Sequence, residues 1–191
     1  MKFNIHDKVF VNLDEAVSKK IKEQICFQIK YFETSRDIPK GIKEINIFNY
    51  SKFLDKGAKF STIFHLNFGS NKGFHNPNKK LAVEKNQKGF NIYIGDYGFI
   101  VNQYIQLLLL EVGITFVHAG GVVNSNNNVI LFPGPGGVGK TAILNHFIEK
   151  RNFKVLGDDL IGIDRQGICY SFPREFVLKR VVEPPYMSSR M

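Results

Sequence analysis

The 191-residue sequence has no Trp and only two cysteines, Cys26 and Cys169. The cysteines form no C-x-x-C pair, and no histidine lies at a spacing that suits a zinc site. This scarcity excludes zinc-finger modules and disulfide-rich scaffolds, and it leaves room for one disulfide at most. We expect a reduced, cytoplasmic setting.

Apolar runs long enough to cross a bilayer are also missing. The longest run, Tyr97 to Leu110, is too short and is interrupted by polar residues such as Asn102 and Gln106. At the N-terminus, Asp7 and Lys8 precede any apolar stretch, so no signal peptide is expected. These absences predict a protein without a membrane partner.

Acidic residues are in the minority, because 17 Asp and Glu against 26 Lys and Arg give a net charge of +9. Such an excess can attract nucleic acid, anionic lipid or an acidic protein. However, the lysines of the first half are scattered and form no block longer than two. We therefore interpret the charge as a feature of a soluble protein, and a nucleic-acid partner is not expected.

The sequence does contain a glycine-rich pattern, between an apolar run and a helical pattern. The stretch Val129 to Leu144 reads VILFPGPGGVGKTAIL and matches the phosphate-binding loop G-x-x-x-x-G-K-[ST]. The apolar start predicts a strand, and the spacing of apolar residues after the loop predicts a helix. Backbone N–H groups and a helix N-terminus together bind anions. The pattern therefore predicts a nucleoside triphosphate site made of Gly134, Pro135, Gly136, Gly137, Val138, Gly139, Lys140, Thr141 and Ala142.

The residue types in this pattern have distinct predicted roles. Gly136, Gly137 and Gly139 permit positive φ angles and a close approach of phosphates. Lys140 supplies a positive charge for the β- and γ-phosphates, and the hydroxyl of Thr141 can ligate Mg²⁺. The expected ligands are therefore ATP, or another nucleoside triphosphate, and Mg²⁺.

Three more side chains are candidates for the chemistry. Asp158 and Asp159 follow an apolar strand expected at residues 153–156, eighteen residues after Lys140. A strand parallel to the one that enters the loop would place both carboxylates beside the phosphates. One carboxylate can hold Mg²⁺ while the other orients or deprotonates the nucleophile. His118 lies on a strand expected to pair with the loop-entering strand, so its side chain could reach the γ-phosphate region.

Three stretches occur in an order that resembles the kinase domain of bacterial HPr kinase/phosphorylase and its HPr-kinase-like relatives: VHAGGVV, VILFPGPGGVGKT and KVLGDDLIGI. These relatives belong to the phosphoenolpyruvate-carboxykinase-like group of phosphate-loop proteins. The resemblance covers roughly residues 97 to 180. It implies an ATP-dependent serine kinase that transfers the γ-phosphate to a small protein or peptide. Because HPr kinase is a hexamer, it also implies a tendency to form homo-oligomers.

The resemblance assigns a role to each candidate catalytic residue. Lys140 would bind the phosphates, and His118 would contact the reacting phosphate. Asp158 would act as the base toward the acceptor hydroxyl. Thr141 would bind the Mg²⁺, and Asp159 would support the metal.

The expected fold is α/β, with a strand-rich α+β segment over residues 1–96 and a phosphate-loop domain over residues 97–191. For the second part, the resemblance implies a phosphoenolpyruvate-carboxykinase-like mixed β-sheet with flanking helices. The chain ends before the later acceptor-binding segments of that family, so we expect a C-terminally shortened domain. Periodicity predicts strands at 3–11, 44–48, 60–68, 90–94, 115–123, 129–132, 160–163 and 168–172, a helix capped by Asp14, and a helix at 99–111.

Two other classes of function remain open. A chain that binds nucleotide but lacks the acceptor-binding segments would be a catalytically incomplete regulatory or scaffold module. A nucleic-acid-associated NTPase is suggested by the positive charge alone.

Overall fold

The structure is a computed structural model and describes residues 1–55 and 73–172. The chain divides into two compact units, Met1–Thr115 with Asp164–Gly167, and Phe116–Ile163 with the described residues 168–172. This division falls later in the chain than the boundary expected between residues 96 and 97. The reason is that helix α3 (Val101–Glu111) packs on strands of the first unit.

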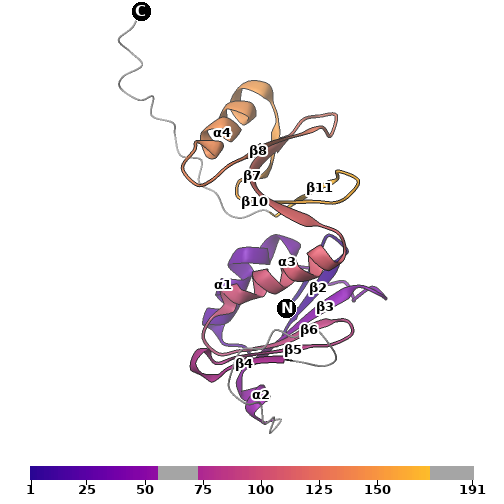
Figure 1. The fold of residues 1–191 in the computed structure, drawn as a ribbon, viewed down its shortest axis with the longest axis vertical. Coiled ribbons are helices and arrows are strands. Elements are labelled where there is room, and N and C mark those ends of the chain that lie inside the picture. Colours follow the sequence, from indigo (N-terminus) through magenta and orange to yellow (C-terminus); the bar gives the residue numbers. More distant parts are fainter. Residues whose placement is uncertain (56–72, 173–191) are drawn as a thin grey trace, which may run out of the picture. The chain divides into compact units, whose positions relative to one another are not determined.

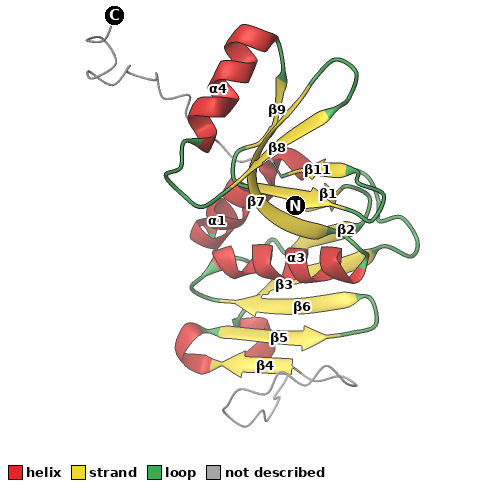
Figure 2. Cartoon of the chain, turned by 45° about the horizontal axis from the view of Figure 1, so that its top comes forward, coloured by secondary structure: helices red, strands yellow, loops and turns green. Residues whose placement is uncertain are grey.

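The first unit contains a mixed, six-stranded sheet in the order β1-β2-β3-β6-β5-β4. Parallel pairing joins β2 to β3 and β3 to β6, and the other neighbours are antiparallel. Figure 2 shows the strands in yellow. Their bounds are β1 Lys2–Ile5, β2 Val9–Leu13, β3 Lys43–Asn49, β4 Gly73–Asn76, β5 Leu81–Lys85 and β6 Gly89–Ile94.

Two helices, α1 (Lys19–Ile29) and α3, cover one face of this sheet, while the short α2 (Ser51–Leu54) lies on the other (Figure 1). Three short 3-10 helices span Lys30–Phe32, Pro77–Lys79 and Gly98–Ile100. Apolar residues at helical spacing on α1 and α3 face alternate residues of the strands, and this pattern buries a core. Its buried members include Ile21, Ile25, Ile29, Ile45, Ile47, Ile92, Ile94, Ile105, Leu108 and Leu109.

Two predictions about the first thirty residues are wrong. The strand expected at 3–11 is a hairpin of β1 and β2, because His6 and Asp7 take positive φ angles of 53° and 54° and reverse the chain. Asp14 does not cap a helix; its carboxylate accepts a hydrogen bond from the Ala16 N–H at 2.8 Å in a local turn. Helix α1 begins later, at Lys19.

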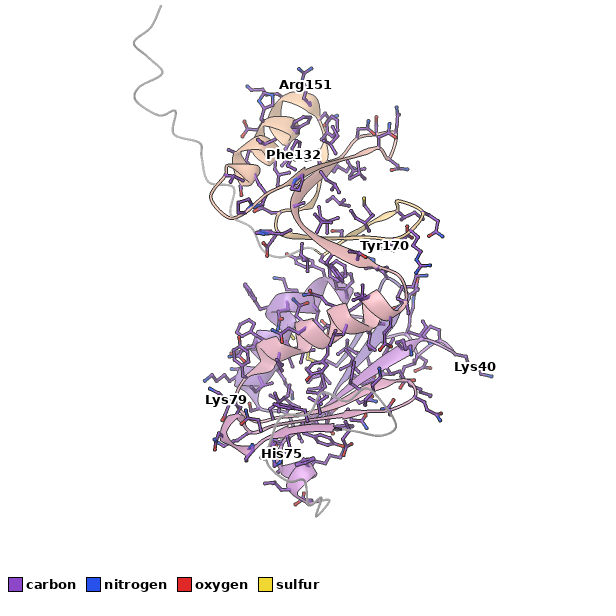
Figure 3. All side chains as sticks on the ribbon, viewed as in Figure 1. Lys40, His75, Lys79, Phe132, Arg151 and Tyr170 are labelled. Carbon is purple, nitrogen blue, oxygen red and sulfur yellow. The ribbon has the colours of Figure 1, made fainter. Side chains whose placement is uncertain are left out.

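The middle of the first unit differs in one further respect. Polar residues suggest a loop before Lys80, but residues Gly73–Asn76 form β4, which pairs antiparallel with β5. On β4, His75 (labelled in Figure 3) is half-buried, and its Nε2 lies 2.7 Å from the hydroxyl of Tyr50, which gives it a structural contact within the first unit. The strand expected at 60–68 lies outside the described residues.

The second unit is built around β7 (Thr115–Val123). Strands β8 (Val129–Pro133) and β9 (Lys154–Gly157) both pair antiparallel with β7. They therefore run in the same direction as each other and end at the same edge of the sheet. Helix α4 (Lys140–Arg151) joins them, and the hairpin of β10 (Leu160–Ile163) and β11 (Cys169–Ser171) extends the sheet through β7.

Helix α4 packs closely on the sheet because Gly120 of β7 has no side chain. A Cβ atom at Gly120 would lie 3.2 Å from Leu144 Cδ1 of α4. Phe132 of β8, labelled in Figure 3, packs against Phe147 of α4 with the two rings tilted by 46° and their centroids 5.4 Å apart. The second unit buries fewer apolar side chains than the first; among the described residues these are Ala119, Val122, Leu144, Ile161 and Phe172.

The chain is thus a mixed α/β protein with two sheets, which confirms the predicted fold class at that level. Within the described ranges, residues 1–55 and residues 73–172, no helix has both the length and the apolar character that a membrane crossing requires.

Candidate functional site in the second unit

We call residues Gly134 to Gly139 the glycine loop; it connects β8 to α4. Gly137 and Gly139 have φ angles of 82° and 91°, in the left-handed region that glycine tolerates. Gly136 does not have the positive φ that we expected for it. Residues from Pro135 to Gly139 are exposed. An exposed turn of this kind, directly before a helix N-terminus, is suited to binding an anion.

Lys140 is the first residue of α4, and only 8% of it is exposed. Its ammonium donates hydrogen bonds to the carbonyl oxygens of Gly134 and Pro135, each at 2.8 Å. An ammonium group has three N–H donors, so these two bonds leave one for a further acceptor. The charge of Lys140 and the helix N-terminus both favour a negatively charged ligand at this position.

Thr141 is hydrogen-bonded to the first of the two aspartates. Its Oγ1 lies 3.1 Å from each carboxylate oxygen of Asp158. The hydroxyl donates its single hydrogen to the carboxylate, and its own lone pairs remain available. Hydroxyl and carboxylate oxygens are ligands that Mg²⁺ prefers. Thr141 and Asp158 are therefore two neighbouring oxygen groups that could hold a Mg²⁺.

His118 is paired with the second aspartate. Its Nε2 lies 2.9 Å from Oδ1 of Asp159, and the two side chains are 51% and 49% exposed. Because a carboxylate only accepts hydrogen bonds, the Nε2 atom that faces it carries the hydrogen. In the neutral ring, the lone pair is then on Nδ1.

The alternation of β7 explains why His118 lies near the start of α4. Side chains two residues apart on a strand point to the same face, so His118 shares the face of Gly120, on which α4 packs. The backbone carbonyl of His118 also accepts a hydrogen bond from the N–H of Gly134 at 3.3 Å. His118 therefore lies beside the first residue of the glycine loop.

The structure brings the predicted residues together in two pairs. Thr141 contacts Asp158, and His118 contacts Asp159. The resemblance had instead grouped Thr141 with Asp159 around the metal, with Asp158 as the base. Those roles remain predictions, but the contacts distinguish the two aspartates, which sequence reasoning without the family left interchangeable.

The remaining predicted residues form the surroundings of these pairs. Gly134 and Pro135 provide the carbonyl oxygens that hold Lys140, and Val138 is exposed on the glycine loop. Ala142 is exposed in the first turn of α4. Three further basic residues that could face phosphates or an acidic partner lie outside the described residues: Arg174, Lys179 and Arg180.

Sequence reasoning missed the residues that position the site from behind. Gly120 lets Leu144 approach β7, and a methyl group at Gly121 would collide with the side chains of Ile161 and Leu131. The signal was the Gly-Gly pair in VHAGGVV, because adjacent glycines inside an apolar strand indicate close packing on both faces.

The two pairs are small clusters of potential metal ligands. In the described ranges, no group of three or more His, Cys, Asp or Glu side chains could hold a metal ion. This composition is compatible with Mg²⁺, which usually takes only one or two protein ligands and completes its coordination with phosphates and water.

The chain was compared with models of known protein families and with curated protein sequences. Neither comparison finds a match.

Proposed function

We propose that the second unit binds a nucleoside triphosphate together with Mg²⁺ and transfers the γ-phosphoryl group to a hydroxyl of a small protein or peptide. The observation that carries the proposal is the contact between Thr141 and Asp158. It joins a potential metal ligand at the start of α4 to a carboxylate at the end of β9. Together with the buried Lys140, it supports the proposal of neighbouring sites for a polyphosphate and a cation.

The order of elements supports a finer proposal for the fold. A hairpin leads into the glycine loop, α4 follows, and β9 delivers two aspartates before a second hairpin. This is the arrangement implied by the resemblance to HPr-kinase-like proteins. We propose that the second unit is a phosphoenolpyruvate-carboxykinase-like phosphate-loop domain.

The chain's own groups would divide the work. The third N–H of Lys140 would donate to a phosphate oxygen, and loop N–H groups would hold the others. Thr141 and Asp158 would hold the Mg²⁺, whose charge neutralises the β- and γ-phosphates. The pair of His118 and Asp159 would lie on the side of the γ-phosphate.

Calorimetric titration of the full chain with ATP and Mg²⁺ tests the binding step. Replacing the buried Lys140 by Ala removes a charge-assisted hydrogen bond worth about 1.5–3 kcal/mol, so the affinity should fall by roughly tenfold or more. Lys150→Ala is the matched control, because Lys150 is exposed near the other end of the same helix. Equal affinities in both variants would contradict the proposed site.

Transfer is tested with γ-labelled ATP and candidate peptides. Label on a peptide serine that disappears with Lys140→Ala would support the kinase. Tight binding without transfer or hydrolysis would instead favour the nucleotide-binding regulatory module.

A further inference from the structure

His118 has the surroundings of a nucleophile rather than of a purely structural side chain. It is half-exposed, and the described residues give it one side-chain contact, from Nε2 to Asp159 at 2.9 Å. That contact leaves Nδ1 with its lone pair and without a partner among the described residues. A histidine fixed through one nitrogen by a carboxylate, with the other nitrogen accessible, is oriented for attack by that second nitrogen.

The position of His118 in the fold also favours a role as a nucleophile. Its carbonyl bonds to Gly134 of the glycine loop, and its side chain shares the α4 face of β7 with Gly120. Asp159 follows directly after Asp158, which contacts Thr141. The imidazole thus lies at the edge of the sheet where the loop, the helix N-terminus and both aspartates meet.

We propose that His118 is itself phosphorylated: its Nδ1 accepts the γ-phosphoryl group of a bound nucleoside triphosphate, and Asp159 is the positioning residue. This inference rests on the proposed nucleotide binding and goes beyond it by placing a covalent phosphohistidine before the final acceptor. It identifies a modification site on this chain.

The step is balanced without any further reactant. The Nδ1 lone pair forms a bond to the γ-phosphorus, and the bond from that phosphorus to the bridging oxygen breaks, releasing the nucleoside diphosphate. The ring gains positive charge, which the carboxylate of Asp159 stabilises through the Nε2–H hydrogen bond. An acceptor hydroxyl, or water, then forms a P–O bond as the P–N bond breaks, and the hydroxyl proton leaves to solvent.

The experiment incubates the full chain with γ-labelled ATP and Mg²⁺, and separately measures nucleotide affinity by calorimetry. A phosphohistidine is labile in acid and stable in base, whereas phosphoserine behaves in the opposite way. Tandem mass spectrometry at neutral pH then locates the added phosphate. We expect a base-stable label on the peptide that contains His118.

Substitutions at His118 and Asp159, with a control at His146, sharpen the test. His118→Gln retains an N–H donor for Asp159 and removes the nucleophile, so the label should vanish, and calorimetry on the same variant shows whether nucleotide still binds. His146→Gln is the matched control, because His146 is exposed on α4 of the same unit. Asp159→Asn should slow labelling by at least about tenfold, because an amide can impose the wrong tautomer, and Asp159→Glu should restore part of the rate.

The outcomes separate the two proposals. Nucleotide binding without label, an acid-stable label, or a label that persists in His118→Gln overturns the phosphohistidine and leaves the proposed function standing. Failure of the wild-type chain to bind nucleotide overturns both.

Discussion

The hydroxyl of Thr141 lies 3.1 Å from both carboxylate oxygens of Asp158, although the two residues are 17 positions apart in the chain. The contact links the first turn of α4 to the end of β9. The first turn of α4 and the first aspartate therefore belong to the same polar cluster. The predicted role of this cluster in binding a metal can be tested with single substitutions.

Thr141→Ser keeps the hydroxyl, whereas Thr141→Val keeps the shape and loses it. We expect Thr141→Val to weaken the binding of ATP measured with Mg²⁺ by about 10–100-fold, the usual cost of removing a group that orients a metal site. In excess chelator, without free Mg²⁺, the ATP affinity of Thr141→Val should differ little from that of the wild-type chain. Calorimetry with and without Mg²⁺ checks the difference, and a normal Mg²⁺ response in Thr141→Val would refute the role of this hydroxyl.

The two aspartates should respond differently to the same substitution. Asp158→Asn removes the carboxylate beside Thr141, so the Mg²⁺ dependence of ATP binding should weaken by about tenfold or more. Asp159→Asn should weaken that dependence less than Asp158→Asn does, because Oδ1 of Asp159 lies 2.9 Å from Nε2 of His118. The same titrations serve both variants. If Asp159→Asn were the one that lost Mg²⁺ dependence, the grouping implied by the family resemblance would be right.

The register of the first sheet predicts a strong effect at Gly89. It faces Glu44 in the parallel pairing of β3 and β6, and an added methyl group would overlap the Glu44 carbonyl oxygen. Backbone on both sides cannot move cheaply, so Gly89→Ala should lower the free energy of unfolding by about 2 kcal/mol or more.

Urea unfolding followed by far-ultraviolet circular dichroism measures this loss. Gly136→Ala is the control, because a methyl group there meets nothing within 4 Å. A Gly89→Ala chain as stable as the control would show that the register is wrong.

The first unit should also lose stability in acid through Glu111. Lys85, which donates to Glu111 at 2.8 Å, holds the pKa of that carboxyl below its ordinary value, with help from Lys43. A pKa lowered by folding means that the ionised group stabilises the fold above the unfolded pKa, near about 4.3 for Glu. This stabilisation is lost as the pH falls through the lower, folded-state pKa.

Glu111→Gln should therefore show a shallower fall of the unfolding temperature than wild type below about pH 4.3. The effect should be modest, since the side chain is 36% exposed and screened by water. Glu23→Gln, at an exposed position of α1, serves as the control. Parallel pH curves for wild type and Glu111→Gln would count against a stabilising role of the ion pair.

Most of the second unit could be predicted from the sequence because its signals are local. Apolar runs and the glycine pattern predicted β7, β8 and α4, and the helical pattern near residue 100 predicted α3. The first thirty residues were harder. The reversal at His6 and Asp7 requires positive φ angles that residues other than glycine adopt only occasionally, so composition gave no warning.

The residues of the candidate site also differ in how far the sequence could predict them. The sequence pattern was enough to predict Lys140 and Thr141, because they are consecutive residues in the first turn of one helix. Which aspartate meets Thr141 depends on how β9 lies against β7, including the register shift between Gly121 and Val122. A one-residue difference in that pairing exchanges the faces of Asp158 and Asp159, and no local signal in the sequence reports it.

The small number of buried apolar side chains in the second unit should affect how often this unit opens locally. With few fully buried apolar groups holding α4 and β8, opening events should expose their amides to hydrogen exchange sooner than those of β3 and β6. A ligand that binds only the closed form slows such openings in proportion to its saturation. The resistance of the second unit to proteases would then increase with the concentration of nucleotide.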